Sequence, residues 1–577
     1  MSEKQFDFKH QYDPLGNRTQ TVLPGGRELN FLFYGSGHLH QVNLDGKVVS
    51  DFERDALYRE IRRTQGQLRS EFAYDRGGRL SAQRVSRAST AGTAAAQHPT
   101  GLTSPDFPAL SSARDFGDVQ KRLKGVIERH YQYDPSGQLV QWLDRHRGLT
   151  RYRYDAAGRI TRSQIGLLKD WGAVGVSADS PGNATGQPMA ANEQFHWDAA
   201  SNPLPAEAVS GAGGTGAFVA GNRLLVWQDA RYAYDEHGNL IERLQGKRGS
   251  AAQTRTRFTC DAAHQLVCAD VARGPDDNAV AQTFNYAYDA LGRRVAKMDA
   301  FGATHFAWDG DRMALEQRGG KETLHLYHPE SFVPVAQVDD GLLHHLHSDH
   351  LGTPLEASND AGEITWRGTY RTWGNVIVEE GEGIEQRLRF QGQHFDEETG
   401  LHYNRARYYV SDIGRFLTPD PIGLLGDPNA YAYAPNPIEW TDPLGLKNKA
   451  WIETEGCKKV LKICNKFSPG GALDRQAKRF VKAWNAEIQS VGGTMTRRQE
   501  TDQEKKDSKA YKEEKRKQYP CRFAGKVVGH VPDACAGGPS RDGPVTALST
   551  PVNSYFGGIL GGIAIGESYN LVRLVRC

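Results

Sequence analysis

Residues 131–158 read YQYDPSGQLVQWLDRHRGLTRYRYDAAG, which is one short unit repeated twice. Each copy has an aromatic residue, any residue, Tyr-Asp, two further residues and Gly. The alternating aromatics put two rings on one face of a strand. The Asp side chain can accept hydrogen bonds from the next backbone amides, and Gly allows the positive φ that closes a turn. The unit therefore predicts a β-hairpin in which the Asp is structural and not catalytic.

The unit recurs over the first 310 residues. Full copies also lie at Tyr12-Asp13, Tyr74-Asp75, Tyr234-Asp235 and Tyr288-Asp289, and degenerate copies at Trp197-Asp198, Cys260-Asp261 and Trp308-Asp309. One hairpin cannot bury its own face, so we expect the hairpins to pair edge to edge into a long sheet. Residues 89–118 and 172–192 are rich in Ala, Ser, Gly and Pro and are interpreted as loops or insertions.

Composition agrees with a turn-rich β structure and shows a division of charge. The chain has 577 residues with 63 Gly and 23 Tyr, and only 38% are hydrophobic. Residues 447–577 carry 24 Lys and Arg against 13 Asp and Glu, a net charge of +11, whereas residues 1–446 carry 47 against 56, a net −9. A basic tail on an acidic body predicts an acidic partner for the tail, most commonly nucleic acid.

The chain shows no signal peptide, and no apolar run reaches the roughly 18–20 residues of a membrane span, so we expect no stable membrane span. Five of the seven Cys lie in the tail without a CxxC pair, which argues against a cysteine zinc site. Free thiols and a disulfide formed after export both remain open.

Residues 414–446 read GRFLTPDPIGLLGDPNAYAYAPNPIEWTDPLGL and contain two Asp-Pro-x-Gly elements, at Asp420 and at Asp442. After the second element the repeats stop and the basic tail begins. Peptide hydrolysis needs a base that activates water and an acid that protonates the leaving amine. Two nearby carboxylates that cannot both ionise share one proton and supply both roles. The alternative is that both elements are plain turns, because Pro and Gly favour turns in any protein.

Residues 387–446, from RLRFQGQHFDEETGLHYNRARYYVSDIGRF to DPLGL, resemble the core terminus of the Rhs family, and the aromatic-Asp-Gly units resemble its YD repeats. The resemblance implies a mainly β fold, with a hairpin sheet wound into a hollow shell. It implies three domains: the shell (1–386), an autoprotease region (387–446) and a small α+β toxin domain (447–577). It also implies that Asp420 and Asp442 form an autocleavage dyad. Two further implications are a scissile bond between Leu446 and Lys447 and a supporting role for Arg415.

The tail contains Gly529-His530-Val-Pro-Asp533, then Gly537-Gly538 and Val552-Asn553-Ser554. This pattern resembles the HxxD toxin family called novel toxin fifteen, whose members act as nucleases. The resemblance implies that His530 and Asp533 form an acid–base pair or bind a divalent metal, expected to be Mg²⁺. Asp542 is the first candidate for a further ligand, with Asn553 and Glu567. The alternative is that His530 is a turn residue.

The resemblance predicts an interbacterial Rhs effector that encloses a toxin and releases it after Leu446. The toxin is expected to be a metal-dependent DNase, with DNA preferred to RNA by family analogy. Implied partners are a cognate immunity protein and a type VI secretion spike or chaperone. The protein would be made in the bacterial cytoplasm, secreted without a signal peptide, and active in the target-cell cytoplasm. Alternatives are an RNase, an NAD-consuming or protein-modifying enzyme, a membrane-perturbing module, or a surface adhesion protein whose tail only binds.

Overall fold

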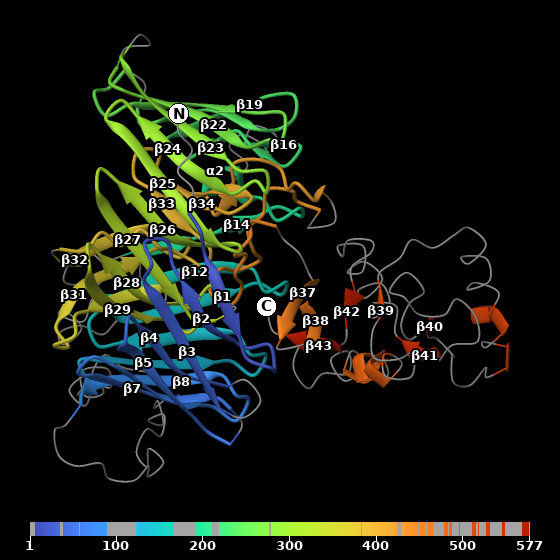
Figure 1. Ribbon diagram of the computed structural model, residues 1–577. Helices are drawn as coiled ribbons and strands as arrows, with labels where there is room; N and C mark the ends of the chain where they lie inside the picture. The colour runs from blue at the N-terminus through green and yellow to red at the C-terminus, as the bar shows by residue number, and fades with distance from the viewer. Residues whose placement is uncertain are drawn as a thin grey trace. The chain divides into compact units, whose positions relative to one another are not determined.

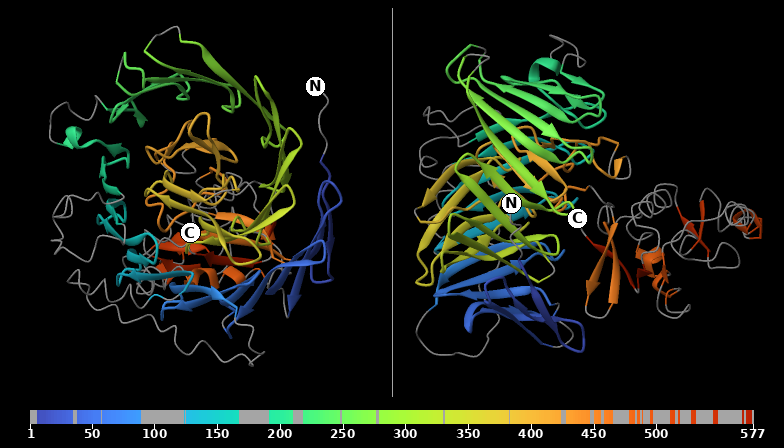
Figure 2. Two further views of the ribbon diagram at one scale, coloured as in Figure 1. Left: turned by 90° about the vertical axis from the view of Figure 1, so that its left-hand side faces the viewer. Right: turned by 45° about the horizontal axis from the view of Figure 1, so that its top comes forward.

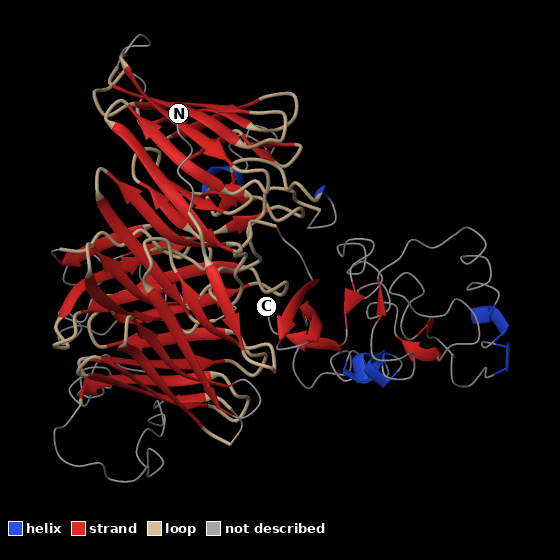
Figure 3. Cartoon of the chain, viewed as in Figure 1, coloured by secondary structure: helices blue, strands red, loops and turns tan. Residues whose placement is uncertain are grey.

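The chain forms two compact units, and most of its described residues are in strands (Figures 1 and 3). The first unit comprises residues 1–11, 18–421 and 429–446, and the second comprises 12–17, 422–428 and 447–577. The computed structural model describes residues 6–34, 38–56, 58–88, 123, 125–166, 191–209, 218–247, 249–275, 279–329, 331–381, 383–423 and 428–446, and in the tail 450–455, 458–464, 478–482, 484–486, 488, 495–496, 511–514, 517–518, 527–530, 545–548, 568–569 and 571–575.

The first unit contains two large antiparallel sheets in which each strand pairs with its neighbours in the chain. This order confirms the mainly β fold and the edge-to-edge pairing of hairpins. The 13-stranded sheet consists of β1 (Lys9–Tyr12), β2 (Arg18–Val22), β3 (Glu28–Tyr34), β4 (His38–Leu44), β5 (Lys47–Arg54), β6 (Glu60–Gln65), β7 (Leu68–Tyr74), β8 (Leu80–Arg87), β9 (Ile127–Tyr133), β10 (Leu139–Asp144), β11 (Gly148–Tyr154), β12 (Ile160–Ile165) and β13 (Ala191–Gln194).

The second large sheet has 15 strands. They are β18 (Val226–Trp227), β19 (Ala230–Tyr234), β20 (Leu240–Gln245), β21 (Thr254–Cys260), β22 (Leu266–Arg273), β23 (Ala281–Tyr288), β24 (Arg294–Asp299), β25 (Gly302–Asp309), β26 (Arg312–Arg318), β27 (Lys321–Tyr327), β28 (Pro334–Asp339), β29 (Leu342–Ser348), β30 (Pro354–Ser358), β31 (Ile364–Tyr370) and β32 (Val376–Gly381). Between the sheets lie β14 (His196–Trp197), β15 (Pro203–Leu204), α2 (Ala206–Val209), β16 (Val219–Ala220) and β17 (Arg223–Leu224).

The predicted turn chemistry of the repeats is confirmed at Asp75. Its Oδ1 accepts hydrogen bonds from the backbone N–H of Gly77 at 2.8 Å and of Arg79 at 3.0 Å. Its Oδ2 accepts one from Arg79 Nε at 2.6 Å, and Gly78 has a φ of +78°. The carboxylate therefore organises the turn, as the sequence pattern predicts.

The tyrosine of each repeat adds a link to the repeat before it. The Tyr133 hydroxyl donates to the carbonyl oxygen of Leu80 at 3.0 Å, and the Tyr154 hydroxyl donates to that of Leu139 at 2.7 Å. Leu80 and Leu139 each begin the return strand of the preceding hairpin. These turns are thus joined to the preceding hairpin by a partly buried hydrogen bond, in addition to the bonds between their strands.

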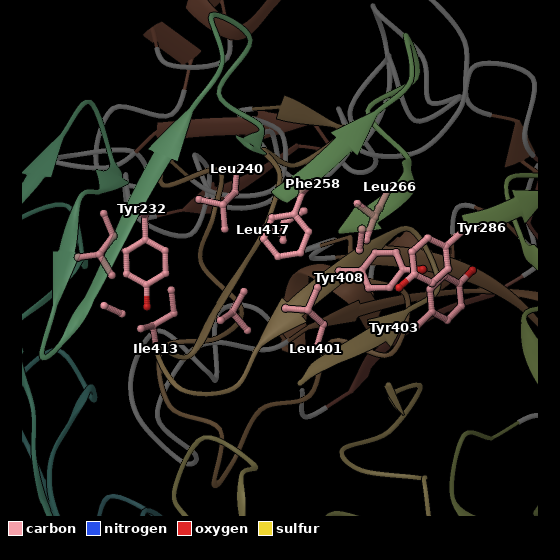
Figure 4. Packing of buried hydrophobic residues seen from close by; sticks show 14 of the residues in the cluster. Tyr232, Leu240, Phe258, Leu266, Tyr286, Leu401, Tyr403, Tyr408, Ile413 and Leu417 are labelled. Carbon is pink, nitrogen blue, oxygen red and sulfur yellow. The ribbon is translucent and has the colours of Figure 1, made fainter. Parts of the chain in front are cut away.

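Residues 387–421 and 429–446 belong to the same unit as most of the repeats, and residues 387–421 supply a four-stranded sheet of β33 (His394–Asp396), β34 (Leu401–Asn404), β35 (Arg407–Val410) and β36 (Arg415–Phe416). Strands of both large sheets curve around it (Figure 2). Leu401, Tyr403 and Tyr408 pack against Leu240 and Phe258 of the 15-stranded sheet (Figure 4). On its other side, a second apolar cluster joins Tyr409 to Ile160 of the 13-stranded sheet.

Buried ion pairs also connect the two large sheets. Arg129 of β9 and Arg147 both bind Glu356 of β30, and the side chain of Glu356 is fully buried. Asp144 lies on the other side of both arginines, with Oδ2 at 3.1 Å from Arg129 Nε and at 3.0 Å from Arg147 Nη1. Two cations thus face two carboxylates, so the buried charge is balanced.

The described tail contains short strands and a helical stretch. The strands are β37 (Ala450–Glu455), β38 (Lys458–Cys464), β39 (Met495–Thr496), β40 (Val527–His530), β41 (Val545–Leu548), β42 (Ser568–Tyr569) and β43 (Leu571–Val575). Residues 478–482 and 484–486 are helical, and Phe480, Val481 and Trp484 are buried. Asn485 makes two hydrogen bonds to the backbone of Val572, at 2.7 and 2.8 Å. Within the described residues, no helix has the length and apolar character that crossing a membrane requires.

Candidate functional site

The two Asp-Pro-x-Gly carboxylates meet at the guanidinium of Arg407, the first residue of β35. Arg407 Nη2 lies 2.9 Å from Asp420 Oδ2 and 3.7 Å from Asp442 Oδ2. The Arg407 side chain is fully buried, and Asp420 and Asp442 are 7% and 5% exposed. The structure therefore brings together the two residues that the sequence predicted as a pair, around a cation that the sequence reasoning did not single out.

Arg407 also holds the backbone on either side of the pair. Its Nη1 donates to the carbonyl oxygen of Ala430 at 2.8 Å, and its Nε donates to that of Gly445. The guanidinium carbon lies 3.6 Å from the centre of the Phe416 ring, a distance at which the cation and the ring attract each other. All three guanidinium nitrogens and one face of the group are therefore engaged, and the side chain has little freedom to move.

The turn from Asp442 to Leu446 is closed by the Asp442 side chain, whose Oδ1 accepts a hydrogen bond from the Leu446 N–H at 3.0 Å. The Asp442 carbonyl oxygen accepts one from Asn404 Nδ2 at 2.8 Å, and the Ala406 N–H donates to the Leu444 carbonyl at 3.0 Å. Gly445 has a φ of +64°, and a Cβ there would lie 2.4 Å from the Asn404 carbonyl oxygen. Only glycine fits this close approach of two backbones.

The cluster contains one cation and two carboxyl groups. Two ionised carboxylates around one guanidinium carry a net charge of −1, and burial disfavours an uncompensated charge. One proton shared between the carboxylates makes the cluster neutral. Burial lowers the pKa of Arg407, and the neighbouring Asp420 and Asp442 act in the opposite direction. The arrangement can therefore hold one ionised and one protonated carboxyl group next to the backbone of residues 445–446.

Arg415, for which a supporting role was predicted, points to other groups. Its guanidinium binds the carbonyl oxygen of Asn222, lies 3.4 Å from Asn202 Oδ1, and stacks 4.8 Å from the centre of the Tyr431 ring. Burial lowers its pKa, with Tyr234 the first of the neighbours that act against this. Arg415 thus joins residues 202–222 to residue 431, and the guanidinium beside the carboxylates is that of Arg407.

The remaining predicted residues are described only in part. Leu446 is the last residue of the first unit, and Lys447 lies outside the described residues. His530 ends β40, where its backbone pairs with Val545 of β41, but its side chain is not described. Asp533 and Asp542, and also Asn553 and Glu567, lie outside the described residues. The predicted roles of these residues in the tail stay predictions.

The only sequence signal for a role of Arg407 is its position at the start of an otherwise aromatic and aliphatic strand. It occurs in RARYYV, where an arginine begins a strand that is otherwise aromatic and aliphatic. A cation at the start of a buried strand needs a partner of opposite charge, because an unpaired buried charge is costly. That signal indicates some buried carboxylate, but it does not say which one.

Comparison with known proteins identifies the body of the chain. The Teneurin YD-shell family matches residues 183–435, and the RHS Repeat family matches residues 133–164. The chain is 36% identical over 467 residues to the "Double-stranded DNA deaminase toxin A" of Burkholderia cenocepacia, covering 75% of this chain and 28% of that protein. It is 32% identical over 493 residues to the "Toxin protein Tse5" of Pseudomonas aeruginosa, covering 76% and 34%.

A third relative is the "Probable deoxyribonuclease RhsB" of Dickeya dadantii, which is 31% identical over 366 residues, covering 62% of this chain and 23% of that protein. The chain thus spans between about a quarter and a third of the length of these relatives. Among solved structures, the TcdB2-TccC3-Cdc42 crystal structure matches with a TM-score of 0.48 and 16% identity, covering 77% of this chain and 22% of that one. The repeat turns and the ordered hairpin sheets thus agree with the matches of residues 133–164 to the RHS Repeat family and of residues 183–435 to the Teneurin YD-shell family.

Proposed function

We propose that this chain belongs to an Rhs polymorphic-toxin effector, which cuts its own backbone after Leu446 and so frees residues 447–577 as a toxin that acts on DNA. The observation that carries the first half is the buried cluster of Arg407, Asp420 and Asp442 beside the turn that ends at Leu446. The second half rests on the relatives and on the basic tail.

The cleavage reaction follows from the cluster. Asp420 has the shorter contact to Arg407, so we assign it as the ionised base that takes a proton from the attacking water. Asp442 already binds the Leu446 N–H through Oδ1, which keeps its carboxyl group close to the following peptide bond. We assign it as the acid that protonates the departing amide nitrogen of Lys447. Arg407 is a positioning residue, because it holds Asp420 and the carbonyl of Gly445 without touching the scissile bond.

Two observations support DNA as the target of the tail: the printed names of two relatives and the net positive charge of residues 447–577. DNA appears in the printed name of the Burkholderia cenocepacia relative, and deoxyribonuclease in that of the Dickeya dadantii relative. These two names describe different reactions, although each relative matches most of this chain. The similarity therefore supports a shared body and does not identify the reaction that the tail catalyses. The net charge of +11 favours a polyanion. We propose hydrolysis of DNA with His530 and Asp533 as the reacting pair.

If Mg²⁺ were bound by His530, Asp533 and Asp542, it would polarise the phosphate. The side chains of these three residues are not described, and the cleavage after Leu446 does not depend on the ion. The proposal also includes a cognate immunity protein and delivery through a type VI secretion spike. Its support is the printed name of the Pseudomonas aeruginosa relative, a toxin protein.

The deciding experiment is the intact mass of the purified chain. Wild type should appear as two fragments that divide after Leu446, whereas Asp420→Asn and Asp442→Asn should stay whole or be cut on the order of 10²–10⁴ times more slowly. The control is Asp412→Asn, which removes an exposed carboxylate from the same region and should leave cleavage unchanged. Cleavage at the wild-type rate in Asp442→Asn would refute the proposed dyad.

A further inference from the structure

Three buried side chains of the first unit come together between two sheets: Glu316 of β26, His325 of β27 and His394 of β33. Glu316 is 7% exposed, and each histidine is 2% exposed. One donor atom from each residue lies within 4.8 Å of the other two. This cluster is separate from the Arg407 site, and the proposed cleavage does not use it.

The strands place these residues on one face. β26 and β27 pair with Glu316 opposite Thr323, so His325, two residues further along, lies diagonally across from Glu316 on the same side of the sheet. His394 approaches from the four-stranded sheet, and its ring lies edge-on to that of His325, with centroids 6.2 Å apart. Two adjacent strands and one strand of another sheet thus contribute one ligand atom each.

The spacing of the donors fits a tetrahedral metal ion. His325 Nε2 lies 3.6 Å from Glu316 Oε1, and His394 Nε2 lies 3.4 Å from Glu316 Oε2. Zinc bonds to nitrogen and oxygen are roughly 2.0–2.1 Å long, so neighbouring donors around a tetrahedral ion are about 3.3–3.4 Å apart. The two observed separations run to different oxygens of Glu316, and one donor atom from each residue lies within 4.8 Å of the others, so a tetrahedral ion fits after small side-chain shifts.

The histidine nitrogens show that the protein itself does not satisfy these groups. Within the described part of the chain, none of the four ring nitrogens of His325 and His394 has a hydrogen-bond partner. Buried polar atoms are nearly always paired, and an ion bound to one nitrogen of each ring would satisfy two of these four atoms.

We propose that Glu316, His325 and His394 form a zinc site that joins the four-stranded sheet to the 15-stranded sheet. Two imidazoles and one carboxylate are a recurrent protein donor set for zinc, and a water molecule supplies the fourth position. Arg387 Nη1 lies 3.4 Å from Glu316 Oε2 and compensates the negative charge of this carboxylate. A zinc ion would replace that positive charge, so its binding requires the partly exposed Arg387 side chain to turn toward solvent. His394 also lines a pocket with Gln391 and Arg389.

The test measures zinc in the full chain after incubation with Zn²⁺ and removal of unbound ion. We expect His325→Ala and Glu316→Gln each to hold one zinc fewer per chain than wild type. The control is His347→Ala, because His347 is equally buried but hydrogen-bonded to Ser358 Oγ at 2.9 Å; it should keep the wild-type amount. Zn²⁺ should also raise the melting temperature of wild type and of His347→Ala, and leave that of Glu316→Gln unchanged.

Two results would overturn the proposal. One is equal zinc content and equal thermal response in wild type, His325→Ala and Glu316→Gln. The other is loss of the bound zinc in His530→Ala with retention in His325→Ala, which would place the ion in the tail. X-ray absorption of the zinc-loaded wild type should show two imidazole ligands, and a zinc spectrum dominated by sulfur would refute the donor set.

Discussion

Replacement of Arg407 by Met tests whether one guanidinium holds the candidate site together. Methionine keeps most of the side-chain volume, but it removes the cation from between Asp420 and Asp442. Removing one partner of a buried ion pair costs about 3–5 kcal/mol, because the remaining charge is buried without compensation. The unit that contains Arg407 has roughly 430 residues, so at about 2.1 cal/mol/K per residue its unfolding entropy is about 0.9 kcal/mol/K. The melting temperature should therefore fall by about 3–5 °C.

The assay is thermal unfolding followed by circular dichroism, combined with the intact mass. Arg367→Met is the matched control, because Arg367 pairs at 3.3 Å with Glu380, which is 62% exposed. Such a surface pair contributes about 0–1 kcal/mol, so this variant should melt within about 1 °C of wild type. Without a fixed Asp420, Arg407→Met should also lose cleavage, and Arg407→Lys should restore part of it, since lysine returns the charge without the planar fork. Equal melting temperatures for Arg407→Met and Arg367→Met, with full cleavage in both, would refute the reasoning.

Other predictions concern the turn, pH and the tail. Gly445→Ala should block cleavage, as judged by intact mass, because the new Cβ would collide with the Asn404 carbonyl oxygen. Burial alone would raise the pKa of Glu356 and Asp144, but the arginines that bind them hold both pKa values below the ordinary range. The stability that these carboxylates contribute is therefore present above their ordinary pKa values and is lost as pH falls below about 4. The melting temperature should drop between pH 5 and pH 3, and an unchanged melting temperature over this range would contradict the prediction. His530→Ala should abolish plasmid degradation and leave the cut after Leu446 intact, and an active His530→Ala protein would exclude that residue as catalytic.

The repeats were predictable because their physics is local. In each turn the carboxylate, the amides that it binds and the glycine lie within five residues, as at Asp75–Arg79, so the pattern fixes the hairpin without reference to the rest of the chain. The order of the strands followed from the same argument. The tyrosine hydroxyl bonds were not predictable, because their acceptors, such as Leu80 for Tyr133, lie in the previous repeat.

The candidate site was predictable only in its carboxylates. Asp420 and Asp442 are conspicuous because each stands in the same short element. Arg407 and Arg415 both begin short buried strands of the four-stranded sheet, and nothing near them in the sequence distinguishes their roles. Which one meets the carboxylates depends on how residues 428–446 pass over that sheet, which is a property of the tertiary structure.

The same distinction applies to the metal cluster. Glu316 and His325 lie on neighbouring strands of one hairpin, where a histidine is as easily explained by packing. His394 comes from a different sheet, and only the packing of that sheet brings its ring to the other two side chains. A three-ligand site spread over such distances in the chain leaves no spacing motif, in contrast to the paired residues of common zinc motifs.

The ladder of strands in chain order has a consequence for protein engineering. β8 and β9 pair directly, with Ala82 opposite His130, although residues 88–126 separate them in the sequence, and β12 pairs with β13 in the same way across residues 166–190. At these two positions the connection has only to bring the chain back to the neighbouring strand. Each doubling of its length increases the entropic cost of closing the loop by only about 0.6 kcal/mol. Both connections are therefore natural places to insert a fluorescent protein or an affinity tag, by which the body could be followed separately from the tail that it carries.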